Sequence, residues 1–123
     1  MPVALARQLR EGTQKSHTMA ENTGFISCFL KGVVDKSSYR NLLADLYFVY
    51  SAMEVEIGRL CEEQHPILMP IGFQELNRRK TLEKDLLFYF GSNWSDLIKA
   101  SEPAKKYVER IHQVAKNSPE LLI

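Results

Sequence analysis

The residues best suited to chemistry are a histidine and a glutamate four positions apart, His17 and Glu21, in the segment SHTMAEN. In a helix such residues share a face, so the carboxylate can hold one imidazole nitrogen and direct the other toward a metal. Small side chains at Thr13, Ser16 and Ala20 leave room beside the imidazole for a flat ligand. Neutral imidazole is a usual ligand of iron. An i,i+4 pair of this kind is more often a solvated helix pair or a capped core residue, and the pattern alone leaves these interpretations open.

Four tyrosines are the other candidates for handling protons. They are Tyr47, Tyr50, Tyr89 and Tyr107, and each phenol can bury its ring while its hydroxyl finds a polar partner. They fit either core tyrosines or acid–base groups beside ordered water. The remaining histidines, His65 and His112, have no second ligand at a recognisable spacing. We expect both to be structural or exposed, and we expect no zinc site, because zinc sites need three or four ligands.

Other catalytic motifs do not occur in the sequence. It contains no GxSxG segment, no Walker loop and no GxGxxG segment, so hydrolase and phosphoryl-transfer functions have no support. Cys28 and Cys61 lie in apolar helical patterns without a CxxC or Cys/His spacing. This placement predicts buried, reduced thiols and no structural disulfide.

Composition indicates a single globular domain, or part of one. The 123 residues include 16 Lys+Arg and 15 Asp+Glu, giving a net charge of +1, so no overall charge points to nucleic acid or to an anionic membrane. No apolar run approaches the roughly 20 residues that cross a bilayer. The N-terminal segment lacks the apolar stretch of a secretory signal. We therefore expect a mature, soluble chain without a membrane anchor.

Hydrophobic periodicity predicts an all-α protein. A loop containing Pro66, Pro70 and Gly72 is expected to pack against the helices, and Ser95 is expected to begin a short one. The other predicted helices span about 3–21, 25–30 (ended by Gly32), 37–61, 75–90 (ended by Gly91) and 103–116.

The last six residues, SPELLI, have the composition of a helix N-terminus. Ser118 suits an N-cap, Pro119 suits the first helical position, and an acid follows in the first turn. One turn is not a stable helix by itself, because nucleation fixes several dihedral angles for a single hydrogen bond. We expect the chain to be the N-terminal part of a longer protein, the alternative being an irregular tail that docks on the bundle.

Five blocks of sequence occur in order over nearly the whole chain: LREGTQKSHTMAEN, LYFVYSAMEVEI, LEKDLLFYFGSNW, KYVERIHQV and SPELLI. Together they resemble the N-terminal half of a heme oxygenase of the soluble cyanobacterial and algal-plastid type. The resemblance implies a helical bundle that holds heme b between a proximal and a distal helix. It also implies conversion of heme, with O2 and electrons, into biliverdin, CO and ferrous iron, so that heme is both cofactor and substrate.

The resemblance assigns a role to each candidate residue of the first helix. His17 matches the proximal iron ligand, and Glu21 matches the acid that orients it. Arg10 matches a basic residue near a heme propionate, where charge-assisted hydrogen bonds fix the rotation of the ring. Thr13 and Ala20 match residues that line the proximal face.

The tyrosines and the partners follow from the same resemblance. Tyr50 and Tyr107 match tyrosines of a distal hydrogen-bond network that relays protons and positions water. The expected partners are heme and a ferredoxin-like reductant, with no nucleic acid, and the expected protein is a monomer in the cytoplasm, or in the plastid stroma if plastid-encoded.

One element of the family pattern is missing from the sequence. In the family, SPELL opens a helix that continues into the glycine-rich distal helix, which the sequence does not contain. We therefore interpret residues 1–123 as the proximal part of one heme oxygenase domain, truncated before the distal helix. The alternatives are a heme-binding module without turnover and a helical interaction protein without heme.

Overall fold

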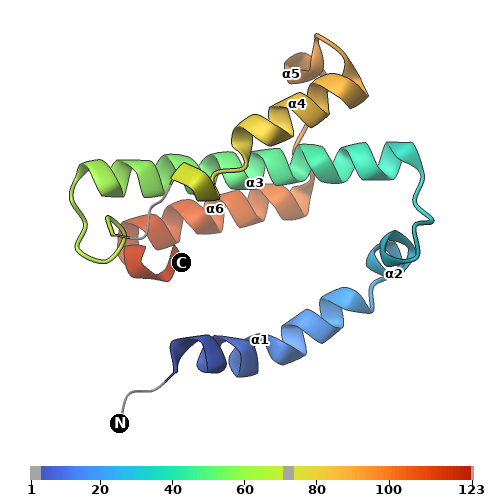
Figure 1. Ribbon diagram of the computed structural model, residues 1–123. Coiled ribbons are helices and arrows are strands. Elements are labelled where there is room, and N and C mark those ends of the chain that lie inside the picture. Colours follow the sequence, from blue (N-terminus) through green and yellow to red (C-terminus); the bar gives the residue numbers. More distant parts are fainter. Residues whose placement is uncertain (1–3, 71–73, 123) are drawn as a thin grey trace. The chain divides into compact units, whose positions relative to one another are not determined.

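The computed structural model describes residues 4–70 and 74–122, and every regular element in these ranges is a helix. The predicted all-α class is therefore confirmed. The chain forms two compact units, residues 1–36 and 37–123, which are described separately. The elements, labelled in Figure 1, are α1 (Leu5–Glu21), α2 (Gly24–Leu30), α3 (Lys36–Glu62), η1 (Gln74–Leu76), α4 (Arg79–Phe90), α5 (Trp94–Leu97), α6 (Glu102–Asn117) and η2 (Pro119–Leu122).

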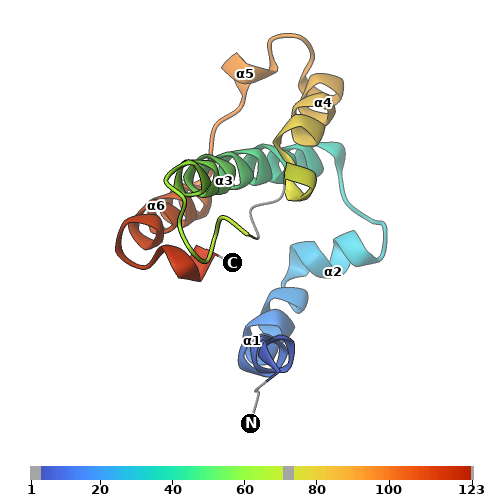
Figure 2. The same ribbon diagram turned by 60° about the vertical axis from the view of Figure 1, so that its left-hand side comes forward.

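The first unit consists of α1 and the short α2, which leaves α1 at a clear angle (Figure 2). Thr23 begins α2, because its Oγ1 accepts a hydrogen bond from the Ile26 amide at 3.4 Å. Gly32 ends α2 with a φ of 72°, and the Val33 amide donates to the Cys28 carbonyl at 2.9 Å. A residue with a side chain would be strained at this φ, so the predicted glycine stop is confirmed.

The second unit is built along α3. Helix α6 runs parallel to α3, because Asp45 of α3 bonds Ser101 at the start of α6, and Glu56 contacts His112 further along both helices. The two helices lie side by side in both views (Figures 1 and 2). Helix α3 thus provides the surface on which the second unit assembles.

Helix α4 runs antiparallel to α3. The Glu54 carboxylate accepts hydrogen bonds from the backbone amides of Arg78 and Arg79, at the start of α4. Near the other end of α4, the rings of Tyr39 and Tyr89 meet edge to face with centroids 5.4 Å apart. Contacts at both ends therefore fix α4 against α3.

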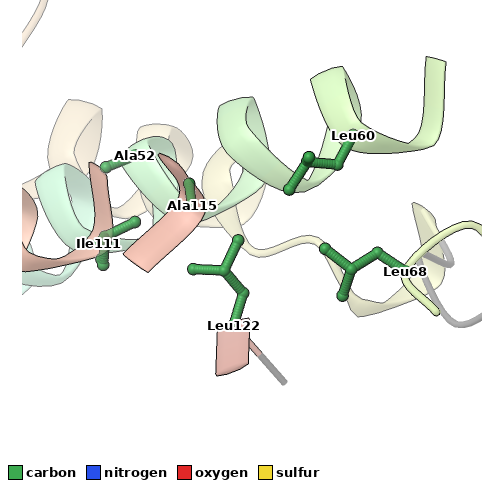
Figure 3. Packing of buried hydrophobic residues seen from close by; sticks show 6 residues of the cluster. All are labelled: Ala52, Leu60, Leu68, Ile111, Ala115 and Leu122. Atoms are coloured by element: carbon green, nitrogen blue, oxygen red, sulfur yellow. The ribbon is translucent and has the colours of Figure 1, made fainter. Parts of the chain in front are cut away.

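Two apolar clusters make the core of the second unit. One joins α3 to α6, η2 and the loop after α3 (Figure 3), and its buried members are Ala52, Leu60, Leu68, Ile111, Ala115 and Leu122. The other joins α3 to α4 and the segment after α5, and its buried members are Leu43, Ala44, Leu82, Leu86 and Ile98. Burial of these side chains provides the main driving force for packing on α3.

The prediction of one helix over 75–90 is wrong at its beginning. A 3₁₀ turn occupies Gln74–Leu76, and α4 starts only at Arg79. The position of the start is set by Glu54 of α3, which satisfies amides that the local sequence leaves without a cap. The end of α4 at Gly91, with a φ of 89°, is as predicted.

Smaller corrections apply to two serines. Helix α5 begins at Trp94 after Asn93, so Ser95 lies inside this four-residue helix and does not begin it. Ser118 is the C-cap of α6, and the residues after it form the 3₁₀ turn η2 rather than the first turn of an α-helix. Leu122 is only 8% exposed in the cluster with α6, so this turn is docked as the alternative expectation had it.

The loop after α3 packs down as predicted. Leu68 is fully buried, and the Cys61 thiol donates a hydrogen bond to the Leu68 carbonyl at 3.5 Å. The backbone amides of Ile67 and Leu68 both donate to Nδ1 of His65 at 3.3 Å. Gly72, at the end of this predicted loop, lies outside the described residues.

The expectation of two buried thiols is wrong for Cys28. Both cysteines are free, but Cys28 is exposed and Cys61 is half-buried. The difference arises because α2 has no buried residue, whereas Cys61 contacts the packed loop.

Within the described ranges, no helix combines the length and the apolar content that a bilayer-spanning segment requires.

Candidate functional site

The candidate ligand His17 lies on α1 with its imidazole held by Glu21. Nδ1 of His17 is 2.8 Å from Oε1 of Glu21, and the two side chains are 73% and 52% exposed. A surface pair of this kind contributes about 0 to 1 kcal/mol to stability, so its main effect is on orientation. Because the carboxylate takes Nδ1, Nε2 is the nitrogen left to bind a metal.

Arg10, Thr13 and His17 lie along one side of α1, where they line a hollow of about 700 Å³ together with other residues of the same helix. The Thr13 hydroxyl donates to the Leu9 carbonyl at 2.7 Å, so it is used within the helix. Within residues 4–70 and 74–122, the Arg10 guanidinium has no ion-pair partner, whereas the neighbouring Arg7 pairs with Glu11 at 2.8 Å. Arg10 can therefore bind an anionic group of a ligand.

Ala20 lies one turn after His17, at the end of α1. Its carbonyl accepts hydrogen bonds from the amide and the hydroxyl of Thr23, at 3.2 and 3.0 Å. Ala20 is not among the residues that line the hollow beside Arg10, Thr13 and His17.

Tyr50 of α3 and Tyr107 of α6 belong to the second unit and line one groove of about 490 Å³. They are 38% and 56% exposed, so the interpretation of both as core tyrosines is wrong. Their hydroxyls can donate and accept hydrogen bonds, which suits them to hold water. The other lining residues are Asp45, Leu46, Val49, Met53, Ser101, Pro103 and Ala104.

The candidate residues thus form two sets, one in each unit. The set on α1 offers a single imidazole and a cation, and the set on α3 and α6 offers two phenols. Among the described residues, no three His, Cys, Asp or Glu side chains converge on one point. A metal bound at His17 would therefore need most of its ligands from another molecule, and a porphyrin supplies four in a plane.

Sequence reasoning missed the polar contacts between helices, and the contact of His112 with Glu56 is an example. His112 of α6 is half-exposed, and its Nδ1 lies 2.8 Å from Oε1 of Glu56 on α3. Burial raises the pKa of Glu56, but hydrogen bonds from Arg59 and His112 outweigh it and leave this pKa below its ordinary value. The partners are 56 residues apart, so no local spacing could have indicated the contact.

Comparison with known proteins decides the family. The heme oxygenase family model matches residues 3–123. This chain belongs to the heme oxygenase family. The chain is 59% identical to heme oxygenase 1 of the cyanobacterium Synechocystis, over 123 residues that make up all of this chain and 50% of that protein. It is 54% identical to the heme oxygenase of Porphyra purpurea, again over the whole chain and 51% of the relative.

Solved heme oxygenase structures match the fold. The crystal structure of Synechocystis heme oxygenase-1 in complex with heme aligns with a TM-score of 0.91 and 60% identity, covering 98% of this chain and 53% of that one. Heme oxygenase-2 of the same organism, in complex with heme and NO, aligns with a TM-score of 0.92 and 46% identity, covering 98% and 48%. The predicted heme-oxygenase-like fold is confirmed, and the chain spans about half the length of these heme oxygenases.

Proposed function

We propose that this chain supplies the proximal, heme-ligating part of a heme oxygenase, which cleaves heme oxidatively to biliverdin, CO and ferrous iron. The observation that carries the proposal is the contact between His17 Nδ1 and Glu21 at 2.8 Å, on an exposed face of a heme oxygenase family chain. It provides the one protein ligand that heme iron needs and fixes which nitrogen is used.

The residues present fit heme as the substrate. Bound heme would supply the iron at which O2 reacts, with electrons from a reductant. Glu21 would accept a hydrogen bond from the Nδ1–H of His17 and keep the imidazole in the tautomer whose Nε2 can bind iron. Thr13 and Ala20 would let the ring approach α1 because their side chains are small.

Arg10 would orient the substrate. Its guanidinium has no ion-pair partner in the part of the chain that the structure describes, and it lines the same hollow as His17. A heme propionate is a carboxylate, the group with which arginine forms charge-assisted, often bidentate hydrogen bonds. Such a contact would fix the rotation of the ring and thereby select which edge of the porphyrin reacts.

Tyr50 and Tyr107 would hold water on the distal side and relay protons to the reacting oxygen. The support is that both hydroxyls border one groove that solvent can enter. A phenol hydroxyl can both donate and accept hydrogen bonds, so each tyrosine could link a water molecule to a neighbouring group. We assign them positions in a water network rather than contact with iron.

The partners and the compartment are part of the proposal. We infer a ferredoxin-like electron donor and a monomeric protein of the cytoplasm or the plastid stroma. The support is that the relatives come from cyanobacteria and algae. A second candidate function is heme binding without turnover, because the residues expected to bind heme and those expected to relay protons line separate hollows.

Heme titration of the purified chain tests the ligand assignment. His17→Ala should abolish the absorption spectrum of histidine-ligated heme, because the other two histidines, His65 and His112, do not lie on α1. His112→Ala is a matched control, since His112 is also exposed and also held by a glutamate at 2.8 Å. Equal Soret bands with and without His17 would contradict the assignment.

A turnover assay separates the two candidate functions. The heme complex of the wild-type chain is incubated with ascorbate or reduced ferredoxin and monitored for biliverdin absorption. Biliverdin that depends on His17 supports the oxygenase activity. A His17-dependent heme spectrum that stays unchanged under reductant supports a binding module instead.

A further inference from the structure

Two polar contacts join α3 and α6, and both link residues 56 positions apart. Asp45 bonds Ser101, and Glu56 contacts His112 about three helical turns further along each helix. Equal spacing at both contacts is what a parallel pair of helices in one register requires. The groove that contains Tyr50 and Tyr107 lies at the Asp45 end, since Asp45 and Ser101 also line it.

The contact at Asp45 is a chain of hydrogen bonds that ends in the first turn of α6. The Asp45 carboxylate accepts from the Ser101 amide at 2.9 Å and from the Ser101 hydroxyl at 2.7 Å. The same hydroxyl accepts from the Ala104 amide at 3.3 Å as the N-cap of α6. A carboxylate is favourable here because a helix N-terminus carries partial positive charge.

Apolar packing holds this end of α6 less firmly than the other. The buried residues of α6 are Ala104, Ile111 and Ala115, so the first turn contributes one buried alanine, and Val108 in the second turn is partly buried against the cluster of Ile111. Ile111 and Ala115 pack in the cluster with Leu122 near the Glu56 contact. Alanine removes little apolar surface from water compared with isoleucine, so polar contacts have more influence where Ala104 packs.

We propose that Asp45 is a positioning residue that acts through Ser101. It fixes the N-terminal half of α6 on α3 and so places Tyr107 beside Tyr50 in their shared groove. Without Asp45, α6 keeps its anchor at Glu56 and His112 but its first turns can move. The catalytic meaning of this placement rests on the proposed function, whereas the placement itself does not involve heme.

The experiment uses the heme-free chain of 123 residues, labelled with fluorotyrosine, and fluorine NMR. The protein has five tyrosines, and their resonances are assigned with single Tyr→Phe variants. Asp45→Ala should shift or broaden the Tyr107 resonance, which lies nearly two turns beyond Ser101. Asp45→Asn should restore it, because the amide can accept from the Ser101 amide and donate to the hydroxyl.

Glu54→Ala is the matched control. Glu54 is likewise a carboxylate on α3 that accepts two hydrogen bonds at the start of another helix, but that helix is α4. It should affect Tyr47, whose ring lies 5.9 Å from the Arg79 guanidinium carbon, and leave Tyr107 unchanged. This contrast separates positioning of α6 from a general loss of stability.

The outcomes decide the proposal. An unchanged Tyr107 resonance in Asp45→Ala, or an equal change in Glu54→Ala, overturns it. If Asp45→Ala loses helical circular dichroism, Ser101→Ala replaces it, because that variant keeps the amide contact and should move Tyr107 less, in the same direction. No shift in that variant also overturns the proposal. Failure of the wild-type chain to bind heme would refute the proposed function and leave the NMR result standing.

Discussion

The contact between Glu21 and His17 leads to a quantitative prediction about heme affinity. Removing the group that orients a metal-binding histidine typically lowers metal affinity by about 10- to 100-fold. Glu21 is 52% exposed, so water can partly replace its carboxylate in Glu21→Ala. We therefore expect the low end, a loss of about tenfold in heme affinity, equivalent to about 1.4 kcal/mol.

The measurement is a heme titration followed by Soret absorption, comparing the wild-type chain with Glu21→Ala and Glu63→Ala. Glu63 is a matched control, because it also belongs to an i,i+4 pair, with Arg59 at 3.0 Å, is 58% exposed and does not line the hollow beside His17. Its removal should leave heme affinity unchanged. If Glu21→Ala binds heme as tightly as the wild-type chain while His17→Ala does not, the orienting role of Glu21 is refuted.

Three further predictions concern stability, each measured by urea unfolding followed by circular dichroism. Leu68→Ala should lower the free energy of unfolding by about 2 to 5 kcal/mol, because the Leu68 side chain is fully buried. Ile67→Ala, at a position 48% exposed, should lower it by less than about 1 kcal/mol, and similar losses in the two variants would contradict the packing of the loop. Gly91→Ala should cost about 1 to 2 kcal/mol because φ is 89°, and a neutral result would contradict this backbone conformation. Because the pKa of Glu56 is lowered, its carboxylate stabilises the fold at pH values above its ordinary pKa of 4.5, and this stabilisation is lost as the pH falls through the lower pKa of the folded state. In Glu56→Gln, the free energy of unfolding should therefore fall less over that pH range than in the wild-type chain.

Local sequence rules account for much of the fold. The glycine stops at Gly32 and Gly91 are confirmed, because a positive φ is strained for residues with a side chain. Ser101 caps α6 for the same kind of local reason, since its hydroxyl satisfies an amide of the following turn. The start of α4 was mispredicted because Glu54, which caps it, is distant in sequence.

The candidate site shows the same division. The contact between His17 and Glu21 follows from their spacing on one helix, and the structure contains it. The roles of these residues toward heme stay predictions. The exposure of Tyr50 and Tyr107 did not follow from the sequence, because an apolar ring in a helical pattern fits a core position as well as a groove.

By itself, the sequence determined the helical class, the family and the side-by-side placement of groups within one helix. Helix geometry fixes which residues share a face, so His17 and Glu21 meet whatever the rest of the chain does. Only the tertiary structure decided which helices pack together, and hence that Asp45 bonds Ser101 and that Tyr50 and Tyr107 border one groove. The physical reason is that helix packing depends on the fit of apolar faces over the whole unit, and no short stretch of sequence specifies that fit.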